Sequence, residues 1–460
     1  MTTISKLLCL LACLLITMTT LAEQTKPNIL FIFADDWGFG DLSCHGHEII
    51  ETPNLDRLAS QGINVKDFTV ASGVCSPSRT ALMTGHFPAR YRINQHFHHT
   101  RHHRNAGMPD WLDPQAPMLP RQLQQAGYAT YHIGKWHLTG KPITDAPLPT
   151  AYGYDAAWIW NGPGPEINSQ DVWDKAIDVI EEKRDKPFFI NLWLNETHTP
   201  HFPTQKWLDY YAKKGLDERE RVYPAVASNA DEEIGRILKA LDNAGLTENT
   251  LVIFTSDNGP EYPLERKGKV MNHPELGKGL NTWYSLGSAG DLKGKKRSLH
   301  EGGIRVPFIA RWPAKSQGGL EIQNSAFTAV DLLPTLSKLA GAALPASYTA
   351  DGEDRSQMLF GADLNPRTKP IFWYWPVGKG IDNWPQAAIR VGGFDAWKLL
   401  MTTDGSRVEL YDIRDDPLEQ NNMAADHPEV VERLRGQLEA WLAELPKEAD
   451  PKCFSKLRKK

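Results

Sequence analysis

Short apolar runs alternate with amphipathic stretches along most of the chain. Runs bounded by turn residues predict buried strands at residues 28–33, 128–133, 188–194, 251–255 and 306–310. Helical patterns lie between these runs, at residues 52–62 and at about 172–183, 228–244 and 329–340. Strands that alternate with helices predict an α/β fold with a large mixed, mostly parallel sheet sandwiched by helices.

The pattern changes after about residue 360. Short apolar runs predict a small antiparallel sheet, and an amphipathic helix follows them: residues 371–375, 388–391, 397–401 and about 428–445. We therefore expect a main α/β domain over residues 23–360 and a smaller C-terminal α+β subdomain over residues 361–460. The basic tail after Pro451 is expected to be frayed.

The N-terminus has the pattern of a secretory signal peptide over residues 1–22. Lys6 precedes a short apolar run, and small residues then predict cleavage after Ala22. No other segment is apolar enough to span a membrane. We therefore expect an exported protein, periplasmic or secreted, with no membrane span in the mature chain.

Three of the five cysteines remain after that cleavage, namely Cys44, Cys75 and Cys453. Exported proteins usually pair their thiols or avoid them. Cys44 and Cys453 could pair, although the sequence does not place them near each other. Cys75 would then be the odd thiol.

The composition of the chain mainly excludes certain classes of protein. The chain is 41% hydrophobic and 23% charged, as in globular proteins, and no tract is of low complexity. A formal net charge of -5 argues against nucleic-acid binding, because such proteins are usually basic.

Polar residues follow four of the predicted strands directly. In open α/β sheets, ligands bind beyond the carboxyl ends of strands, so these residues are candidates for one site. Each pair alone has an ordinary explanation, such as a turn or a helix cap. Their coincidence favours a site formed by Asp35 and Asp36, Lys135 and His137, His198 and His201, and Asp257 and Asn258.

Residues 75–79 form the pattern C-x-P-S-R, and a helical stretch follows as far as Gly85. Pro77 suits the first turn of a helix, which places Cys75 at a helix N-terminus, where free N–H groups favour an anion. That setting suits an activated cysteine or a site for an anionic substrate. A buried structural cysteine is the alternative.

The chemistry of these residues fits together. Asp35, Asp36, Asp257 and Asn258 supply oxygen ligands, which suit Ca²⁺ or Mg²⁺. Positive charge suited to a tetrahedral anion comes from Arg79, Lys135, Lys296 and the histidines.

The chain resembles the type I, formylglycine-dependent sulfatases of the alkaline phosphatase-like superfamily over about residues 26–440. The similar stretches occur in the family's order, at residues 27–38, 52–62, 75–79, 134–137, 257–259, 301–307 and 410–412. C-x-P-S-R and the Gly-Lys-Trp-His stretch are the most specific. The resemblance implies a sulfuric ester hydrolase with its catalytic domain at residues 23–360, and we expect it to act on a sulfated polysaccharide or oligosaccharide.

The resemblance also implies cofactors and roles. Formylglycine (3-oxoalanine) would derive from Cys75 through a formylglycine-generating enzyme or an anaerobic sulfatase-maturating enzyme. Ca²⁺, rather than Mg²⁺, would be held by Asp35, Asp36, Asp257, Asn258 and the modified Cys75. Arg79 would orient the formylglycine, and His137 would accept a proton from it. Sulfate would be held by Lys135, His198 and Lys296, with His198 protonating the leaving alcohol.

Two of these assignments leave alternatives open. Basic residues crowd residues 293–297, so Lys295 could replace Lys296. His198 and His201 both precede x-Pro, and His198 is preferred because it is closer to the end of its strand.

Two other activities are compatible with this pattern. Relatives with this fold include phosphodiesterases and phosphonate monoester hydrolases, some of which also use formylglycine. A catalytically inactive protein that binds sulfated glycans is the third alternative.

Residues 96–104 are unusually rich in histidine and arginine. Arg101 and Arg104 are candidates for binding an anionic saccharide, and the histidines are expected to gain charge as the pH falls toward 6. A solvated surface loop is the alternative.

Overall fold

The computed structural model describes residues 26–459 except residues 169, 264–283, 324, 363–364, 377–383 and 393–395. The expected signal peptide lies outside these residues. Within them, no helix is both long enough and apolar enough to cross a membrane.

A mixed sheet of eight strands forms the centre of the molecule, in the order β5-β4-β6-β1-β7-β8-β2-β9. All neighbouring pairs are parallel except the two that involve β8. The mostly parallel α/β sheet expected from the sequence is therefore confirmed. Its strands are β1 (Asn28–Ala34), β2 (Ile63–Val65), β4 (Ala129–Lys135), β5 (Ala156–Trp160), β6 (Phe188–Trp193), β7 (Thr250–Ser256), β8 (Phe308–Arg311) and β9 (Leu320–Ile322).

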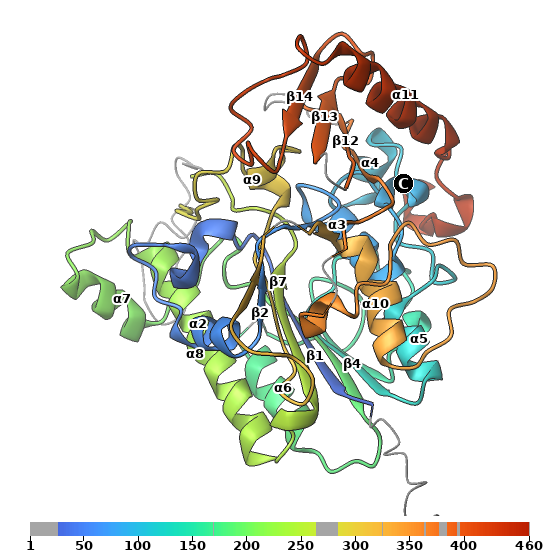
Figure 1. Ribbon diagram of the computed structural model, residues 1–460. Coiled ribbons are helices and arrows are strands. Elements are labelled where there is room, and N and C mark those ends of the chain that lie inside the picture. The colour runs from blue at the N-terminus through green and yellow to red at the C-terminus, as the bar shows by residue number, and fades with distance from the viewer. Residues whose placement is uncertain are drawn as a thin grey trace, which may run out of the picture.

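Helices cover both faces of this sheet (Figure 1). One face packs against α2 (Pro53–Gln61), α6 (Val172–Glu181) and α8 (Val222–Asn243), and the other against α3 (Cys75–Thr84), α5 (Leu119–Gln125) and α10 (Leu332–Leu339). Alternate residues of β1 point into the two cores, with Phe31 in one and Ile32 in the other. Burial on both faces explains why this strand is a continuous apolar run.

A second sheet, fully antiparallel, follows near the C-terminus in the order β11-β12-β13-β14. Its strands are β11 (Ile371–Tyr374), β12 (Ala387–Arg390), β13 (Trp397–Met401) and β14 (Val408–Asp412), and α11 (Pro428–Glu444) packs on it. Leu434, Leu438 and Trp441 are the buried side of α11. The expected antiparallel sheet and terminal helix are confirmed, whereas the boundary at residue 361 stays a prediction.

The expectation of a frayed tail after Pro451 is wrong. Cys453 is buried, and its carbonyl accepts a hydrogen bond from the backbone N–H of Asp110 at 2.8 Å. The Asp110 carboxylate in turn accepts from the backbone N–H of Ser455 at 2.8 Å and from Arg458 at 2.9 Å. A buried carboxylate requires donors, and the tail supplies them. Cys453 is unpaired, as is Cys44.

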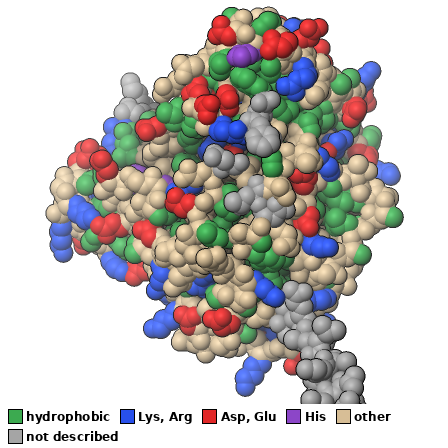
Figure 2. Space-filling model, viewed as in Figure 1, with side chains coloured by type: hydrophobic (Ala, Val, Ile, Leu, Met, Phe, Trp, Pro, Cys, Tyr) green, Lys and Arg blue, Asp and Glu red, His purple; other side chains and the backbone are tan. Residues whose placement is uncertain are grey.

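Charged side chains on the face shown in Figure 2 are of both signs and interspersed. The same mixture of signs gives the whole chain its small net charge of -5. That face therefore carries none of the extended basic surface that binding a nucleic-acid backbone requires.

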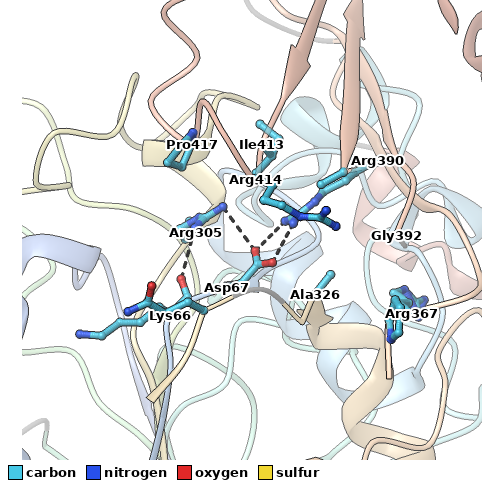
Figure 3. A pocket seen from close by; sticks show the side chains of 13 residues that line it. Lys66, Asp67, Arg305, Ala326, Arg367, Arg390, Gly392, Ile413, Arg414 and Pro417 are labelled. Atoms are coloured by element: carbon cyan, nitrogen blue, oxygen red, sulfur yellow. Dashed lines mark hydrogen bonds and ion pairs between the residues drawn. The ribbon is translucent and has the colours of Figure 1, made fainter. Parts of the chain in front are cut away.

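Buried ion pairs join the small sheet to the main domain. Both terminal nitrogens of Arg390 on β12 donate to the Asp67 carboxylate, each at 2.7 Å. Arg305 lies 3.3 Å from the same carboxylate. These three side chains meet at a cavity of about 160 Å³ at the junction (Figure 3). Because a bidentate pair fixes orientation as well as distance, it restricts how the small sheet packs on the main domain.

Lys398 of β13 forms a second set of buried ion pairs between the small sheet and the main domain, which we call the Lys398 joint. Its Nζ lies 2.8 Å from Glu301 of α9 (Glu301–Ile304) and 2.9 Å from Glu419. Burial alone would raise the pKa of Glu301, but Lys398 and then Arg305 hold it well below its ordinary value. The segment just before Glu301 carries Lys296, so this joint also anchors part of the candidate site.

We expect Lys398→Met to lower the free energy of unfolding by about 3–5 kcal/mol, because it leaves buried carboxylates without their shared cation. Denaturant unfolding measures the change. Lys141→Met is the matched control: it breaks an exposed pair with Glu166 and is expected to cost less than about 0.5 kcal/mol. A Lys398→Met shift no larger than that of the control would contradict the stabilising role of the joint.

Candidate functional site

The site begins where the neighbouring strands β1 and β7 end. The two strands pair in parallel and in register to their last residues, so Asp35 and Asp257 emerge side by side. Asp257 accepts a hydrogen bond from the backbone N–H of Asp36 at 3.1 Å, and Asn258 donates to the Asp36 carboxylate at 2.7 Å. All four side chains are buried. The sheet thus brings together the oxygen-bearing residues expected from the sequence.

Cys75 is the first residue of α3 and lies beside these acids. Its Sγ is 3.8 Å from the Nζ of Lys135, which also forms an ion pair with Asp35. Candidate ligand atoms of Asp35, Asp36, Cys75 and His198 all lie within 4.8 Å of one another. We call these four residues the acidic cluster, and they form a possible metal-binding group.

Lys135 reaches the acidic cluster because β4 passes very close to β6. Gly134 has a φ of 105°, and a Cβ there would lie 2.1 Å from the carbonyl oxygen of Trp193. Only glycine tolerates both the left-handed backbone and the close approach. Glycine at position 134 is therefore a requirement of the sheet, and Lys135 directly follows it at the end of β4.

Arg79 is fully buried one turn along α3. Its guanidinium donates to Asp257 at 2.6 Å and lies 3.5 Å from Asp35. The same group lies over the rings of Trp193 and Phe33, at 4.7 and 5.1 Å from their centroids. Carboxylates and aromatic faces together stabilise a buried cation. Arg79 therefore ties the first turn of α3 to the ends of β1 and β7.

Two further side chains approach Asp36. Lys296 donates to its carboxylate at 2.6 Å, and Nε2 of His198 lies 3.8 Å from the same oxygen. Lys295 donates to a backbone carbonyl elsewhere, and His201 contacts a backbone carbonyl of its own loop. The structure thus places Lys296 and His198 at the site, in preference to their sequence neighbours.

His137 lies two residues beyond β4. Its Nε2 is 2.8 Å from the carbonyl oxygen of Phe97, and its Nδ1 is buried without a hydrogen-bond partner among the described residues. Burial, and then the nearby Lys135, lower the pKa of His137 well below its ordinary value. The imidazole is therefore neutral, with Nε2–H donating to the carbonyl and a lone pair left on Nδ1.

The thiol of Cys75 is not activated by its position. Burial raises the pKa of Cys75 well above its ordinary value, and Asp35 and Asp257 raise it further against the effect of Lys135. A nucleophilic cysteine acts as the thiolate, and this thiol is protonated at neutral pH. Of the two functional interpretations of the helix N-terminus, this pKa shift favours the anion site over the activated thiol.

Asp35 and Asp257 have opposite pKa shifts. Burial alone would raise the pKa of Asp35, but Lys135 and then His198 hold it well below its usual range. Burial, and then repulsion by Asp35, raise the pKa of Asp257 to about 7. Two buried carboxyl groups this close resist carrying full charge together unless cations lie beside them.

The residues present fit a hard divalent cation. Asp35 Oδ1 and Asn258 Oδ1 are buried oxygen atoms that form no hydrogen bond within the described part of the chain. Carboxylate and amide oxygens are the ligands that Ca²⁺ and Mg²⁺ prefer. The acidic cluster also contains His198, which the sequence had assigned to the sulfate and not to the metal.

The acidic cluster opens into a cavity of about 710 Å³. Five of the residues expected from the sequence line it: Cys75, Lys135, His137, His198 and Lys296. A volume of this size accommodates a small organic ligand and not only an anion.

The histidine-rich segment contributes only in part. His96 and His98 line the cavity, and the chain then enters α4 (Thr100–Asn105). Arg101 and Arg104 are exposed on α4 and do not line the cavity; Arg104 donates to a backbone carbonyl of the C-terminal tail. Their role in substrate binding stays a prediction.

The pKa shifts of three of these histidines oppose the expected gain of charge near pH 6. Burial, and then His102, lower the pKa of His96 to about 3. Burial also lowers the pKa of His98 and of His102. Rings packed this closely disfavour one another's charged form.

The lining residues that were missed from the sequence include Trp160, Asn161, Glu261 and Arg297. Glu261 lies in the same segment after β7 as Asp257, and Arg297 lies in the basic run at residues 293–297. The sequence therefore contained a pattern that could have indicated both residues. Trp160 is the last residue of β5 and Asn161 follows it; this strand alternates between half-buried and buried residues and was not among the strands expected from the sequence.

Comparisons with known proteins agree with this geometry. The family model described as Sulfatase matches residues 27–342, and that described as N-sulphoglucosamine sulphohydrolase, C-terminal, matches residues 294–447. The chain is 28% identical to the N-acetylgalactosamine-6-O-sulfatase of Bacteroides thetaiotaomicron, covering 91% of this chain and 93% of that one. It is 32% identical to the N-acetylgalactosamine-6-sulfatase of Canis lupus familiaris, covering 76% and 68%.

A solved structure connected with the metabolism of multiple glycosaminoglycans by Bacteroides thetaiotaomicron is also similar. It matches with a TM-score of 0.73 and 26% identity, over 91% of this chain and 100% of that one. The likeness therefore includes both the main sheet and the C-terminal sheet.

Proposed function

This chain belongs to the sulfatase family and is a sulfuric ester hydrolase, and we propose that it is exported and acts on a sulfated polysaccharide or oligosaccharide. Two relatives bear the name of N-acetylgalactosamine 6-sulfatases, and the similar structure is connected with glycosaminoglycans. N-acetylgalactosamine 6-sulfate is accordingly the first sugar substrate to test.

The observation that carries the proposal is the position of Cys75 within C-x-P-S-R. It lies in the first turn of a buried helix, 3.8 Å from Lys135, at a cavity that Lys296 also lines. A helix N-terminus with buried lysines beside it stabilises a tetrahedral anion. The remaining cavity volume leaves room for the alcohol part of the ester.

We propose that Cys75 is converted to formylglycine by a maturating enzyme. In support, the unmodified thiol is protonated at neutral pH because burial raises its pKa. When formed, the formylglycine supplies a hydrated aldehyde whose hydroxyl can attack sulfur. Arg79, one turn further along α3, holds the Asp257 carboxylate toward the same end of the helix.

Ca²⁺ is the metal that we propose, with Mg²⁺ less favoured. Asp35, Asp36, Asp257, Asn258 and the modified Cys75 would hold it, since the first four offer buried oxygen atoms at the ends of two adjacent strands. A bound cation supplies polarisation of the sulfate oxygens. Ca²⁺ is favoured over Mg²⁺ because it accepts an irregular oxygen shell.

Lys135 and Lys296 bind the sulfate in this proposal. Burial alone would lower the pKa of Lys296, but Asp36 raises it above its ordinary value, so the ammonium group is retained. Burial, and then Lys135, lower the pKa of His198 to about 3. We therefore propose that His198 protonates the leaving alcohol with the help of Lys296, which retains its proton.

His137 is the proton acceptor in the proposal. Its Nε2–H is engaged by the Phe97 carbonyl, and its Nδ1 lone pair is free among the described residues. A neutral imidazole held in one tautomer by a backbone carbonyl is suited to take a proton at the other nitrogen.

Export and domain roles complete the proposal. Residues 1–22 act as the signal peptide, residues 23–360 form the catalytic domain and residues 361–460 form the C-terminal subdomain. The apolar run before Ala22 and the antiparallel sheet that begins at Ile371 support these limits.

The experiment that tests the function compares initial rates on 4-nitrophenyl sulfate, 4-nitrophenyl phosphate and a phosphonate monoester. Matured protein is expected to favour the sulfate by at least about 100-fold in kcat/KM, as expected for a member of the sulfatase family. Sulfate release from N-acetylgalactosamine 6-sulfate and from a panel of sulfated glycans then identifies the sugar. Preference for the phosphate or the phosphonate, or binding without turnover, would contradict the proposal.

A further inference from the structure

The cavity wall holds strained residues that the proposed chemistry does not use. Six non-glycine residues of the described chain have left-handed φ angles, and four of them belong to the site or line its cavity: Asp36 (63°), His137 (54°), Asn161 (57°) and Arg297 (70°). Side chains with a Cβ avoid this region, so such residues persist mainly where function or packing imposes them. Asp36 and His137 already have roles, whereas Asn161 and Arg297 do not.

Arg297 is held firmly in that conformation. Its backbone N–H donates to the carbonyl of Gly73 at 2.7 Å. Its guanidinium forms a two-pronged ion pair with Glu261, in which Nη1 donates to Oε2 at 3.1 Å and Nη2 donates to Oε1. Both side chains line the cavity. A planar pair of this kind presents donors and acceptors in fixed positions.

The charges within this pair nearly cancel. The guanidinium is neutralised by the carboxylate of Glu261, which also accepts from the backbone N–H of Tyr262 at 2.9 Å and lies 3.4 Å from Lys296. Each terminal nitrogen of Arg297 donates one N–H to Glu261 and carries a second N–H that this ion pair does not use, and 23% of the side-chain surface is exposed. A neutral pair with a donor to spare suits hydroxyl groups better than a second anion.

The Arg297–Glu261 pair lies beside the proposed sulfate-binding residues. Arg297 directly follows Lys296, a proposed sulfate-binding residue, and Lys296 itself contacts Glu261. The cavity of about 710 Å³ is far larger than a sulfate group. A substrate whose sulfate lies at Lys296 would therefore have Arg297 and Glu261 beside the adjoining part of the molecule.

We propose that Arg297 and Glu261 form a sugar-binding subsite that binds hydroxyl groups of the ring that carries the sulfate ester. The inference rests on the proposed action on glycans and adds the residues that select a sugar over a simple alcohol. These residues determine specificity and take no part in bond cleavage.

Arg297→Gly tests the subsite, since glycine accepts the left-handed backbone and removes only the side chain. Kinetics are measured on N-acetylgalactosamine 6-sulfate and on 4-nitrophenyl sulfate, which has no ring hydroxyls. We expect kcat/KM for the sugar to fall about 10- to 100-fold further than for the aryl ester, mainly through KM, as hydrogen bonds to a charged group are lost. Arg297→Lys keeps the positive charge but not the planar guanidinium. This variant is expected to restore little of the kcat/KM for the sugar that Arg297→Gly loses.

Arg92→Gly is the matched control, because Arg92 also has a left-handed φ, of 58°, and does not line the cavity. It is expected to leave kcat/KM for both substrates unchanged.

Equal losses of kcat/KM on both substrates in Arg297→Gly would overturn the subsite and show that Arg297 acts by positioning Lys296. A loss confined to N-acetylgalactosamine 4,6-disulfate would overturn the hydroxyl assignment in favour of a second anion. Failure of the wild-type protein itself on every sulfated sugar, with aryl sulfate still cleaved, would instead contradict the proposed glycan function and the subsite with it.

Discussion

Cys75→Ala is expected to reduce turnover of 4-nitrophenyl sulfate by about 10⁴-fold or more, the scale on which a covalent nucleophile contributes. The side chain is 3% exposed and begins α3, so the variant loses one buried atom and keeps its helix. Circular dichroism and the thermal midpoint are expected to remain close to those of the wild type. Initial rates at saturating substrate measure the effect.

Cys453→Ala provides the matched control for that experiment. Cys453 is also 3% exposed and unpaired, but it packs beside Trp111 in a separate small cluster. Its replacement is expected to leave turnover intact. Activity retained in Cys75→Ala, or lost equally in both variants, would remove Cys75 from the chemistry.

Asp35→Asn is expected to abolish stoichiometric Ca²⁺ binding and to lower kcat/KM at least about 100-fold, because it removes one charge from a group of hard ligands without changing its shape. Elemental analysis of the purified protein measures the metal. In the wild type, a chelator is expected to suppress turnover and added Ca²⁺ to restore it. Metal content can be read even where no turnover remains.

Asp231→Asn is the control for the metal experiment. Asp231 is an equally buried carboxylate, but it accepts hydrogen bonds from the backbone at the start of α2, at Asn54 and Leu55. This variant is expected to retain its calcium. Stoichiometric zinc that supports turnover, or unchanged calcium in Asp35→Asn, would contradict the hard-cation assignment.

The central sheet and the acidic residues of the site could be predicted for one physical reason. Parallel strands buried on both faces read as continuous apolar runs, as in β1 and β7, and their carboxyl ends meet at one edge of the sheet. Asp35 and Asp257 follow such strands directly. Their position at one edge of the sheet could therefore be predicted from the two runs, whereas the pairing of β1 with β7 comes from the structure.

Other parts depended on tertiary contacts that no local pattern reveals. The strands β2 and β9 are three residues long and are formed by pairing within the sheet. The tail after Pro451 is ordered because it meets the buried Asp110, which is distant in sequence.

The cavity wall is the least predictable part. Glu261 and Arg297 are separated by 36 residues and become a pair only through loop packing. Arg101 and Arg104 belong to a basic run that suggested substrate binding, yet α4 leaves both exposed. Composition identified a charged segment without giving the direction in which each side chain points.

The most direct test of the account is mass spectrometry of the peptide that contains residue 75, taken from protein that was produced with a maturating enzyme and assayed for sulfate release. The account predicts that an aldehyde replaces the thiol at position 75 and that specific activity rises in proportion to the converted fraction. Full sulfatase activity in protein whose peptide carries only the unmodified thiol would contradict it.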